Sequence, residues 1–250
     1  DHSFYQCFSL KEIKLPSSLI EIQEYTFQEC KSMESIEFPA NITNISPGTF
    51  YNCPALQQVK FPTNLNNISN YSFYQCTALE KANLPEGLTR IEYCAFYQCS
   101  RLKEVLFPST LATLEDQSFY RCSSLTEIAL PSSLIYCHRP FYECHNIKKV
   151  TCLASVPPTL ENDYDILYGV DKSSTELLVP FWSVNSYKLA SGWDAFPTIN
   201  PLDYETDLIN VPGELVIAAD IRFKNNPTVS VFDNGRLTVR GTDALSMKKY

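Results

Sequence analysis

Cysteine offers the most evident chemistry in this chain, because ten cysteines occur among its 250 residues. Thiols can form disulfides, bind metal ions or act as nucleophiles. Seven of the ten follow a phenylalanine by three positions, and successive members are 23 residues apart five times and then 22. These seven are Cys7, Cys30, Cys53, Cys76, Cys99, Cys122 and Cys144. The regularity indicates a structural repeat, which constrains any chemical role of the thiols.

Disulfides within this column are one reading of the repeat. Parallel coils stack about 4.8 Å apart, so neighbouring cysteine α-carbons would fall within the disulfide range of roughly 4.4–6.8 Å. Side chains in one column point the same way, however, and their Cβ atoms do not converge. A free cysteine beside a phenylalanine column acts as a compact hydrophobic residue. We therefore expect buried free thiols here and at Cys94, Cys137 and Cys152.

Metal binding and catalysis find little support. Zinc sites favour cysteine pairs separated by two to four residues, whereas the nearest groupings here follow from the repeat; they are Cys94/Cys99, Cys137-His138 and Cys144-His145. None of the three histidines lies in a His-Glu-x-x-His motif, and neither a serine-hydrolase elbow nor a phosphate loop occurs. The acidic residues are scattered over repeat positions that we expect to face solvent. We predict no enzyme, no cofactor and no metal.

One short segment interrupts the repeat. His138-Arg139-Pro140 coincides with the single 22-residue step. We expect a distorted coil there, with a local pocket as the alternative.

Composition narrows the class of protein further. The chain is 44% hydrophobic, which is enough to bury a core. With 20 basic and 28 acidic residues its net charge is −8, which argues against binding to nucleic acid. No run approaches the roughly 18 apolar residues of a membrane span. These features favour a folded, acidic protein.

Further columns keep the register of the cysteines and define the fold. An apolar residue lies three positions after each cysteine, another three further on, and a third two positions after that. A proline follows directly in six repeats. Alternating inward residues predict a short parallel strand, which proline ends because it lacks an N–H donor. Each coil then exposes an apolar face that only its neighbours cover. We predict a right-handed leucine-rich-repeat-like solenoid of short parallel strands, mainly β and irregular.

The same columns resemble a known family. The segment Tyr-Cys-Ala-Phe-Tyr-Gln-Cys at 93–99 carries the pattern well, and it is similar to the BspA-like leucine-rich repeats of surface proteins in Bacteroidetes, spirochaetes and some parasitic protists. The resemblance covers roughly residues 4–152. Segments at 155–160, 177–180 and 192–196 resemble the closing part of Bacteroidetes members. The resemblance implies a C-terminal cap.

Three regions are predicted on this basis. Residues 1–152 form about seven leucine-rich-repeat coils, which begin inside a coil, so that earlier repeats are expected to be missing. Residues 153–202 form the C-terminal capping segment. Residues 203–250 form a small β-module that is packed on the cap or incomplete. In this module we expect a strand at 215–219 and a hairpin of 229–232 and 236–239 around an Asn-Gly turn.

The strand positions that face outward, on the expected concave sheet, are the first candidate binding surface. Their charges alternate in sign from coil to coil, which suits either mutual ion pairs or a docking patch where the column turns apolar. The candidate residues are Glu37, Lys60, Lys81, Glu104, Leu106, Glu127, Ala129 and Lys149.

Aromatic residues form the second candidate surface. A tyrosine follows the core phenylalanine in six of the seven coils. Stacked tyrosines could serve packing alone or present a strip for sugars or protein loops. Trp193 matches the family's closing motif and is expected to be buried, whereas Trp182 is expected to be exposed. The aromatic candidates are Tyr74, Tyr97, Tyr120 and Trp182.

These features predict a non-enzymatic binding protein with a rigid repeat scaffold. The resemblance implies adhesion to host extracellular proteins or other cells, at the surface of a Bacteroidetes-type bacterium or in secreted form. One alternative is a carbohydrate-recognition accessory protein of a surface glycan system, and another is a structural spacer that displays the C-terminal module. Four glycosylation sequons begin at Asn41, Asn44, Asn67 and Asn70. In a bacterium they are polar loop residues, and in a eukaryote they could carry glycans.

Overall fold

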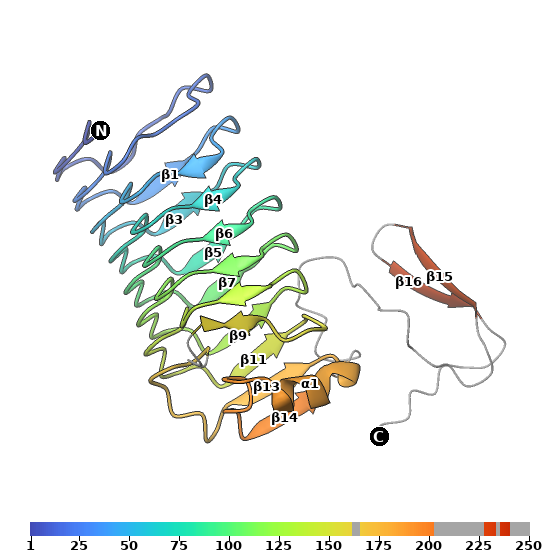
Figure 1. The fold of residues 1–250 in the computed structure, drawn as a ribbon. Coiled ribbons are helices and arrows are strands. Elements are labelled where there is room, and N and C mark those ends of the chain that lie inside the picture. Colours follow the sequence, from blue (N-terminus) through green and yellow to red (C-terminus); the bar gives the residue numbers. More distant parts are fainter. Residues whose placement is uncertain (162–165, 203–227, 234–235, 241–250) are drawn as a thin grey trace. The chain divides into compact units, whose positions relative to one another are not determined.

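The computed structural model describes residues 1–161, 166–202, 228–233 and 236–240. The chain divides into two compact units, Asp1–Pro212 and Gly213–Tyr250. In the first unit, coils stack one on another as a solenoid (Figure 1). The described part of the second unit is an antiparallel hairpin of β15 (Thr228–Asp233) and β16 (Arg236–Arg240).

A first set of parallel strands, one per coil, runs along the solenoid. Residues 23 apart lie opposite each other: Ile36 pairs with Val59, and Ala82 pairs with Val105. The predicted strand at each apolar column is thus confirmed from the second coil onward. The first coil has only one neighbour and contains no assigned strand. The strands are β1 (Ser35–Glu37), β3 (Gln58–Lys60), β5 (Lys81–Asn83), β7 (Glu104–Leu106), β9 (Glu127–Leu130) and β11 (Lys149–Cys152).

A second ladder lies elsewhere on each coil, and the sequence patterns did not predict it. Its strands have only two residues, too few for a period of two to be visible. Each inner strand is paired with the coil before and the coil after it, as Ile68 is with Ile45 and Ile91, and the end strands β2 and β12 are each paired on one side. The strands are β2 (Asn44–Ile45), β4 (Asn67–Ile68), β6 (Arg90–Ile91), β8 (Thr113–Leu114), β10 (Tyr136–Cys137) and β12 (Thr159–Leu160).

The Phe-x-x-Cys segment forms the turn that leads to the first set of strands. Two residues of this turn have positive φ in most coils although they are not glycine, for example Tyr71 (59°) and Gln75 (57°). Their N–H groups donate to the next coil, at 3.1 Å to the Tyr93 carbonyl and 2.7 Å to the Tyr97 carbonyl. Bonds between coils therefore hold a backbone conformation that is costly for these residue types.

Stacked phenylalanines form the axis of the core. Phe73 and Phe119 lie on the two sides of Phe96, each with ring centroids 5.0 Å from it and nearly parallel planes. All three side chains are completely buried. Because every ring packs on the ring of the next coil, the phenylalanine column gives continuous apolar contact along the stack.

The cysteine column has a defined role beside these rings. Cys53, Cys76 and Cys99 each donate their S–H to the carbonyl of the phenylalanine 26 residues earlier, at 3.0–3.3 Å. Nine of the ten free thiols are buried, as predicted, and Cys7 in the first coil is half-buried. Burial raises the pKa of Cys53 to about 12. The thiols fill space in the core and are hydrogen-bonded, and their burial keeps them protonated.

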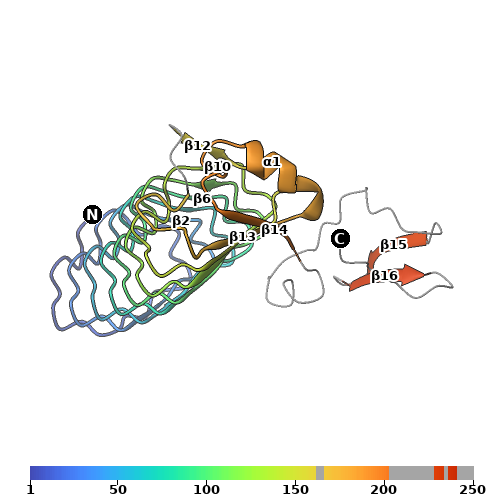
Figure 2. The same cartoon turned by 90° about the horizontal axis from the view of Figure 1, so that it is seen from below.

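The strand ladder continues beyond Cys152. β13 (Glu176–Val179) and β14 (Thr198–Pro201) extend the first set of strands in parallel, with Leu177 opposite both Val150 and Ile199. One sheet thus crosses the predicted boundary at residue 152. Between the two strands lie η2 (Phe181–Ser183) and α1 (Val184–Leu189), at the C-terminal end of the stack (Figure 2). Trp193 is fully buried, as predicted, and donates to the Pro158 carbonyl at 2.8 Å.

The hairpin predicted near the C-terminus has both of its strands. Asp233 lies opposite Arg236, which leaves a two-residue connection. The Asn234-Gly235 turn and the expected strand at 215–219 lie outside the described residues. The division into repeats, cap and β-module stays a prediction.

Candidate binding surfaces

Cross-strand ion pairs occupy one end of the outward face of the first set of strands. Lys60 lies 2.5 Å from Glu37, and Lys81 lies 2.7 Å from Glu104, in each case between residues that are opposite in register. Mutual pairing is therefore confirmed for these four candidates. The side chains of Glu37, Lys60 and Lys81 are strongly exposed and that of Glu104 is partly exposed, so each pair contributes little to stability.

The outward face changes character in the next coils. Leu106 and Ala129 are half-buried, in the column that holds Lys60 and Asn83 in the preceding coils. Glu127 is exposed and lies opposite Lys149, which is half-buried. We call Glu104, Leu106, Glu127, Ala129 and Lys149 the sheet patch. It combines a small apolar step with charged neighbours, an arrangement suited to contact with another protein.

The sheet patch ends where the column becomes buried. Thr151 follows Leu106 and Ala129 in the same column and lies opposite Ala129. In the structure Thr151 is only 5% exposed, and Leu178, which lies opposite it, is 4% exposed. β11 and β13 are thus covered on this face as well. Accessible apolar surface in this column is limited to the two residues before it.

The tyrosine column forms a ladder of parallel rings. Centroids of Tyr51, Tyr74, Tyr97 and Tyr120 are separated by 4.4–4.5 Å, and the planes differ by no more than 22°. Each ring therefore covers the faces of its neighbours, while edges and hydroxyls remain for contact with other molecules. Burial raises the pKa of Tyr74 to about 12. Packing is thus one function of the candidates Tyr74, Tyr97 and Tyr120.

The ladder changes at its C-terminal end. Tyr142 is tilted by 65° against Tyr120 and by 57° against Tyr168. Cationic side chains lie over rings here, with the guanidinium carbon of Arg121 5.0 Å from the centroid of Tyr120. The regular stacking of the central coils stops at this point.

The predicted aromatic site of the cap differs in detail. Trp182 is half-buried, so the expectation of an exposed indole is not met. Its neighbour Phe181 is 51% exposed and packs edge-on against it at 4.9 Å. The reason is local: the next residue, Ser183, is buried and hydrogen-bonded to the Ser155 carbonyl, which turns Trp182 toward the protein.

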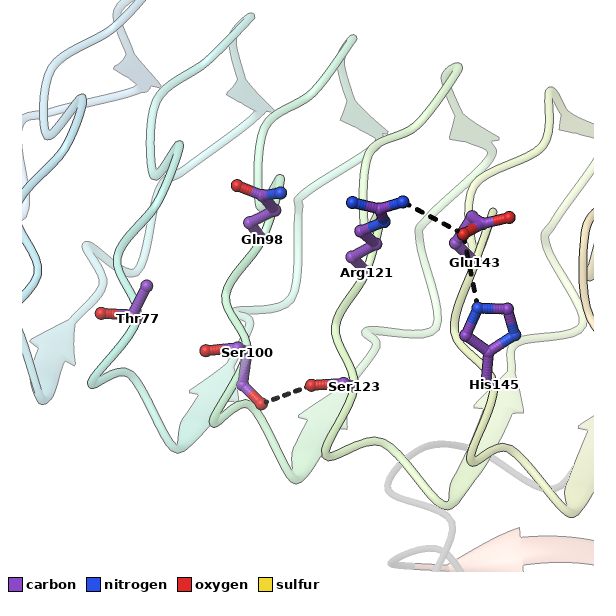
Figure 3. Close-up of a pocket in the computed structure, with 7 residues that line it drawn as sticks. All are labelled: Thr77, Gln98, Ser100, Arg121, Ser123, Glu143 and His145. Atoms are coloured by element: carbon purple, nitrogen blue, oxygen red, sulfur yellow. Dashed lines mark hydrogen bonds and ion pairs between the residues drawn. The ribbon is translucent and has the colours of Figure 1, made fainter.

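A polar groove that sequence reasoning missed crosses four coils (Figure 3). Residues on either side of the cysteine column line this open depression of about 450 Å³. The Arg121 guanidinium lies 3.3 Å from the Glu143 carboxylate, which also lies 3.4 Å from His145. Recurring polar residues just before and after each cysteine were the available signal. The lining residues are Thr77, Gln98, Ser100, Arg121, Ser123, Glu143 and His145.

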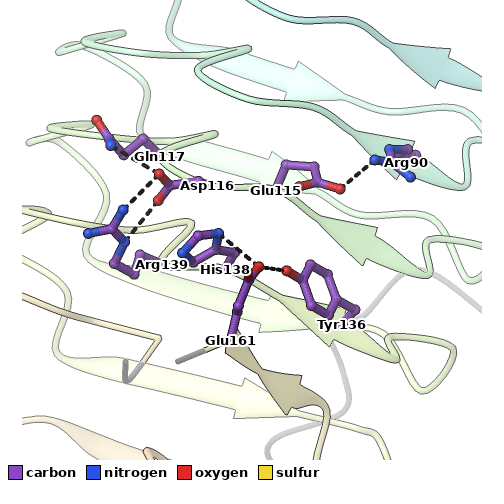
Figure 4. Close-up of polar contacts among 8 residues, drawn as sticks. All are labelled: Arg90, Glu115, Asp116, Gln117, Tyr136, His138, Arg139 and Glu161. Atoms are coloured by element: carbon purple, nitrogen blue, oxygen red, sulfur yellow. Dashed lines mark hydrogen bonds and ion pairs between the residues drawn. The ribbon is translucent and has the colours of Figure 1, made fainter. Parts of the chain in front are cut away.

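The segment at 138–140 keeps the positive-φ turn of the other coils, and β10 before it stays in the regular 23-residue register, so the expected distortion of this coil stays a prediction. Arg139 has a φ of 37° and bonds Asp116 through Nε and Nη2, at 3.0 and 2.8 Å (Figure 4). His138 lies 3.2 Å from Glu161, which also accepts the Tyr136 hydroxyl. The charged groups of this segment satisfy one another, so the arrangement holds adjacent coils together.

Neither a metal-binding cluster nor a membrane-spanning helix occurs in the described part of the chain. No group of three or more histidine, cysteine, aspartate or glutamate side chains could hold a metal ion there. Within the same residues, no helix has the length and apolar character needed to cross a membrane.

Comparison with protein families gives one match. The model of the BspA type leucine rich repeat region matches residues 1–100 and 66–162, in six copies. This is a repeat family. Among curated protein sequences none matches the chain.

Solved structures with the same kind of fold come from several bacteria. A leucine-rich repeat protein from Bacteroides ovatus shares 19% identity and a TM-score of 0.50, with 80% of this chain covered. This chain spans 63% of that protein. The T. pallidum leucine rich repeat protein shares 21% identity and a TM-score of 0.60, over 66% of this chain and 79% of its own. A leucine rich cell surface protein from Faecalibacterium prausnitzii shares 19% identity and a TM-score of 0.45, over 81% and 68%.

Proposed function

The chain belongs to the BspA type leucine rich repeat family, and we propose that it is a non-enzymatic surface or secreted protein that binds another protein. The location at the cell surface is inferred from the family resemblance, since repeats of this kind occur in surface proteins of bacteria. An adhesive role toward host extracellular proteins or other cells is the specific form of the proposal. The rigid stack of coils supports it, because such scaffolds present extended recognition faces.

The sheet patch is the observation that carries this function. Elsewhere on the outward face, charges are paired across strands, as Glu37 is with Lys60. At Leu106 and Ala129 the same face offers half-buried apolar surface instead. Binding energy at protein interfaces concentrates on a few apolar or aromatic anchors that a polar rim surrounds. Glu104, which is paired with Lys81, and Glu127, which lies opposite Lys149, supply such a polar rim.

Leu106→Glu is the test of this site. Wild type and variant are passed over immobilised fibronectin, fibrinogen, collagen and laminin, and binding is followed by surface plasmon resonance. We expect saturable binding of the wild type to at least one of these proteins and a loss of about tenfold or more in affinity for the variant, because a charge replaces the apolar centre.

Ile135→Glu is the matched control. Ile135 is 67% exposed and precedes β10 of the second ladder, so the same chemical change is made on another face. Equal losses in both variants would contradict the sheet patch as the site. If the wild type bound none of the four proteins, adhesion to these host proteins would be contradicted and the spacer function would be the better explanation.

A charge test separates the rim from the centre. Combined reversal of Glu104→Lys and Glu127→Lys turns a rim of opposite charges into a wholly basic one, and it is expected to change the association rate and its salt dependence more than the dissociation rate, because rim charges act mainly on encounter. The comparison variant Glu12→Lys changes an outward charge of the first coil, far from the patch along the chain, and is expected to have little effect.

A further inference from the structure

We infer that the polar groove is a second binding site, and that its ligand is a short chain of neutral sugars. This site is separate from the sheet patch and does not depend on the protein-binding proposal. It consists of positions directly before and after the cysteine column in four successive coils (Figure 3). None of its residues belongs to the sheet patch or to the tyrosine ladder.

Charge balance argues against an ionic ligand. The one guanidinium of the groove, Arg121, lies 3.3 Å from the one carboxylate, Glu143. The pair neutralises itself, so neither an anion nor a basic peptide gains a net electrostatic attraction from it. The other lining groups are hydroxyls, an amide and an imidazole. A neutral ligand therefore fits the groove better than a charged one.

Backbone geometry argues against an extended peptide. Strand addition needs free main-chain donors and acceptors at a sheet edge. On the groove floor, the N–H of Ser100 donates to the Gln98 carbonyl at 2.7 Å and that of Ser123 to the Arg121 carbonyl at 2.8 Å. The Ser100 carbonyl already accepts from the Ser124 hydroxyl at 2.7 Å. The groove thus offers side-chain groups, and no backbone ladder, to a ligand.

Side-chain chemistry and spacing favour sugar hydroxyls. The Ser100 hydroxyl can donate and accept, whereas the Ser123 hydroxyl donates to the Ser100 carbonyl at 3.3 Å and can still accept. The Gln98 amide, the Arg121 guanidinium and the Glu143 carboxylate each keep further hydrogen-bonding capacity beyond their contacts within the protein. Coils are about 4.8 Å apart, a separation similar to the length of one sugar ring in a chain. Four coils span roughly 14 Å, room for about three linked rings. An open groove suits a chain that lies along the surface.

The test uses defined oligosaccharides on the intact chain. Maltohexaose, cellohexaose and laminarihexaose are titrated by saturation-transfer NMR and calorimetry, with oligogalacturonate as the charged comparison. We expect at least one neutral hexaose to bind. Gln98→Leu and Arg121→Met should each weaken its affinity by about fivefold or more, because each removes hydrogen-bonding groups from the groove.

Two matched variants separate binding from packing. Gln75 donates to Gln98 at 2.8 Å but does not line the groove, so Gln75→Leu breaks the same hydrogen bond outside the site. Arg101→Met breaks an exposed ion pair with Glu80 and also leaves the groove intact. Both controls should bind the hexaose as the wild type does. Circular dichroism checks that every variant is folded.

Several results would overturn the inference. These are absence of binding by all three neutral hexaoses, binding of oligogalacturonate alone, and unchanged affinity in both groove variants. A loss in Gln75→Leu equal to that in Gln98→Leu would have the same meaning. The Leu106→Glu variant should bind the hexaose normally, which keeps the outcome distinct from that of the protein-binding proposal.

Discussion

Individual residues of each coil are adapted to the coils next to them. Gly48 has a φ of 60°, and its counterparts Tyr71 and Cys94 have nearly the same angle without being glycine. The backbone conformation alone therefore does not require glycine at position 48. A Cβ atom there would lie 2.2 Å from the ring of Tyr25 in the preceding coil. The neighbouring ring, and not the turn, selects glycine.

Gly48→Ala is expected to lower the free energy of unfolding by roughly 1–3 kcal/mol, because the methyl group overpacks the contact with Tyr25. Urea unfolding measures the effect. In a Tyr25→Ala background the same substitution should cost much less, since the ring is gone. An equal cost in both backgrounds would show that backbone strain, and not the ring, determines the residue.

Thiol reactivity tests the cysteine column at the same scale. Burial raises the pKa of Cys94 to about 12 and of Cys152 to about 11, and only Cys7 is partly accessible. At pH 8 a maleimide should therefore label the native protein at Cys7 alone, and all ten cysteines once the protein is denatured. Cys7→Ala should abolish the native labelling. Rapid labelling of the cysteine column from Cys30 to Cys144 in the native protein would contradict the burial of these thiols.

The coil is the element of this fold, and its stability comes from the coils above and below it. Phe96 lies between two stacked rings and is fully buried, whereas the half-buried Phe4 stacks only on Phe27, at 5.2 Å. The same residue type thus has unequal surroundings in the middle and in the first coil. Nearest-neighbour stacking predicts that its contribution to stability differs accordingly.

Phe96→Ala should destabilise the protein by about 3–5 kcal/mol through loss of burial and a cavity between coils, and Phe4→Ala by about half of that or less. Guanidinium unfolding followed by circular dichroism compares the two variants. Equal effects would mean that the first coil is packed as firmly as the central ones.

Much of this element could be read from the sequence. The columns of apolar residues fixed the position and register of strands such as β3 and β7, because side chains 23 residues apart have to pack on one another. The second ladder was not predictable in this way, since dipeptides such as Asn67-Ile68 show no periodicity of their own. The hydrogen bonds from thiols to phenylalanine carbonyls depend on turn geometry, which residue types alone do not give.

The candidate sites were less predictable than the fold. Which side of a strand faces outward follows from alternation, so the ion pairs of Glu37 and Glu104 were foreseeable. Accessibility depends on what covers a side chain, and Trp182 differs from expectation for that reason. The polar groove arises from side chains of different columns that meet between coils, a relation visible only in three dimensions.

Many thiols and phenols are buried along the molecule, and their raised pKa values make its stability depend on pH. Burial raises the pKa of Cys30 from an ordinary value of 9.0 to about 11, and that of Cys53 and Cys144 to about 12. Below pH 9 these groups are protonated in both folded and unfolded chains. Above it the unfolded chain loses protons that the folded chain retains, so stability declines between about pH 9 and pH 12.

The melting temperature should therefore be constant from pH 7 to about 8.5 and fall steeply above pH 9, with about 1.4 kcal/mol per pH unit for each linked proton. Differential scanning calorimetry at closely spaced pH values measures it. Cys53→Ala should reduce the alkaline slope relative to wild type at equal buffer composition. A melting temperature that stays constant up to pH 11 would contradict the burial of these groups.

At the scale of the whole molecule, the central claim is that a rigid solenoid binds its protein partner through one outward face. Hydrogen–deuterium exchange on the complex with the panel protein that binds most tightly tests this most directly. We expect protection on binding to be concentrated in β7 and β9, around Leu106 and Ala129, with little change in the second ladder. Protection confined to the second ladder or to the cap, with β7 and β9 unchanged, would contradict it.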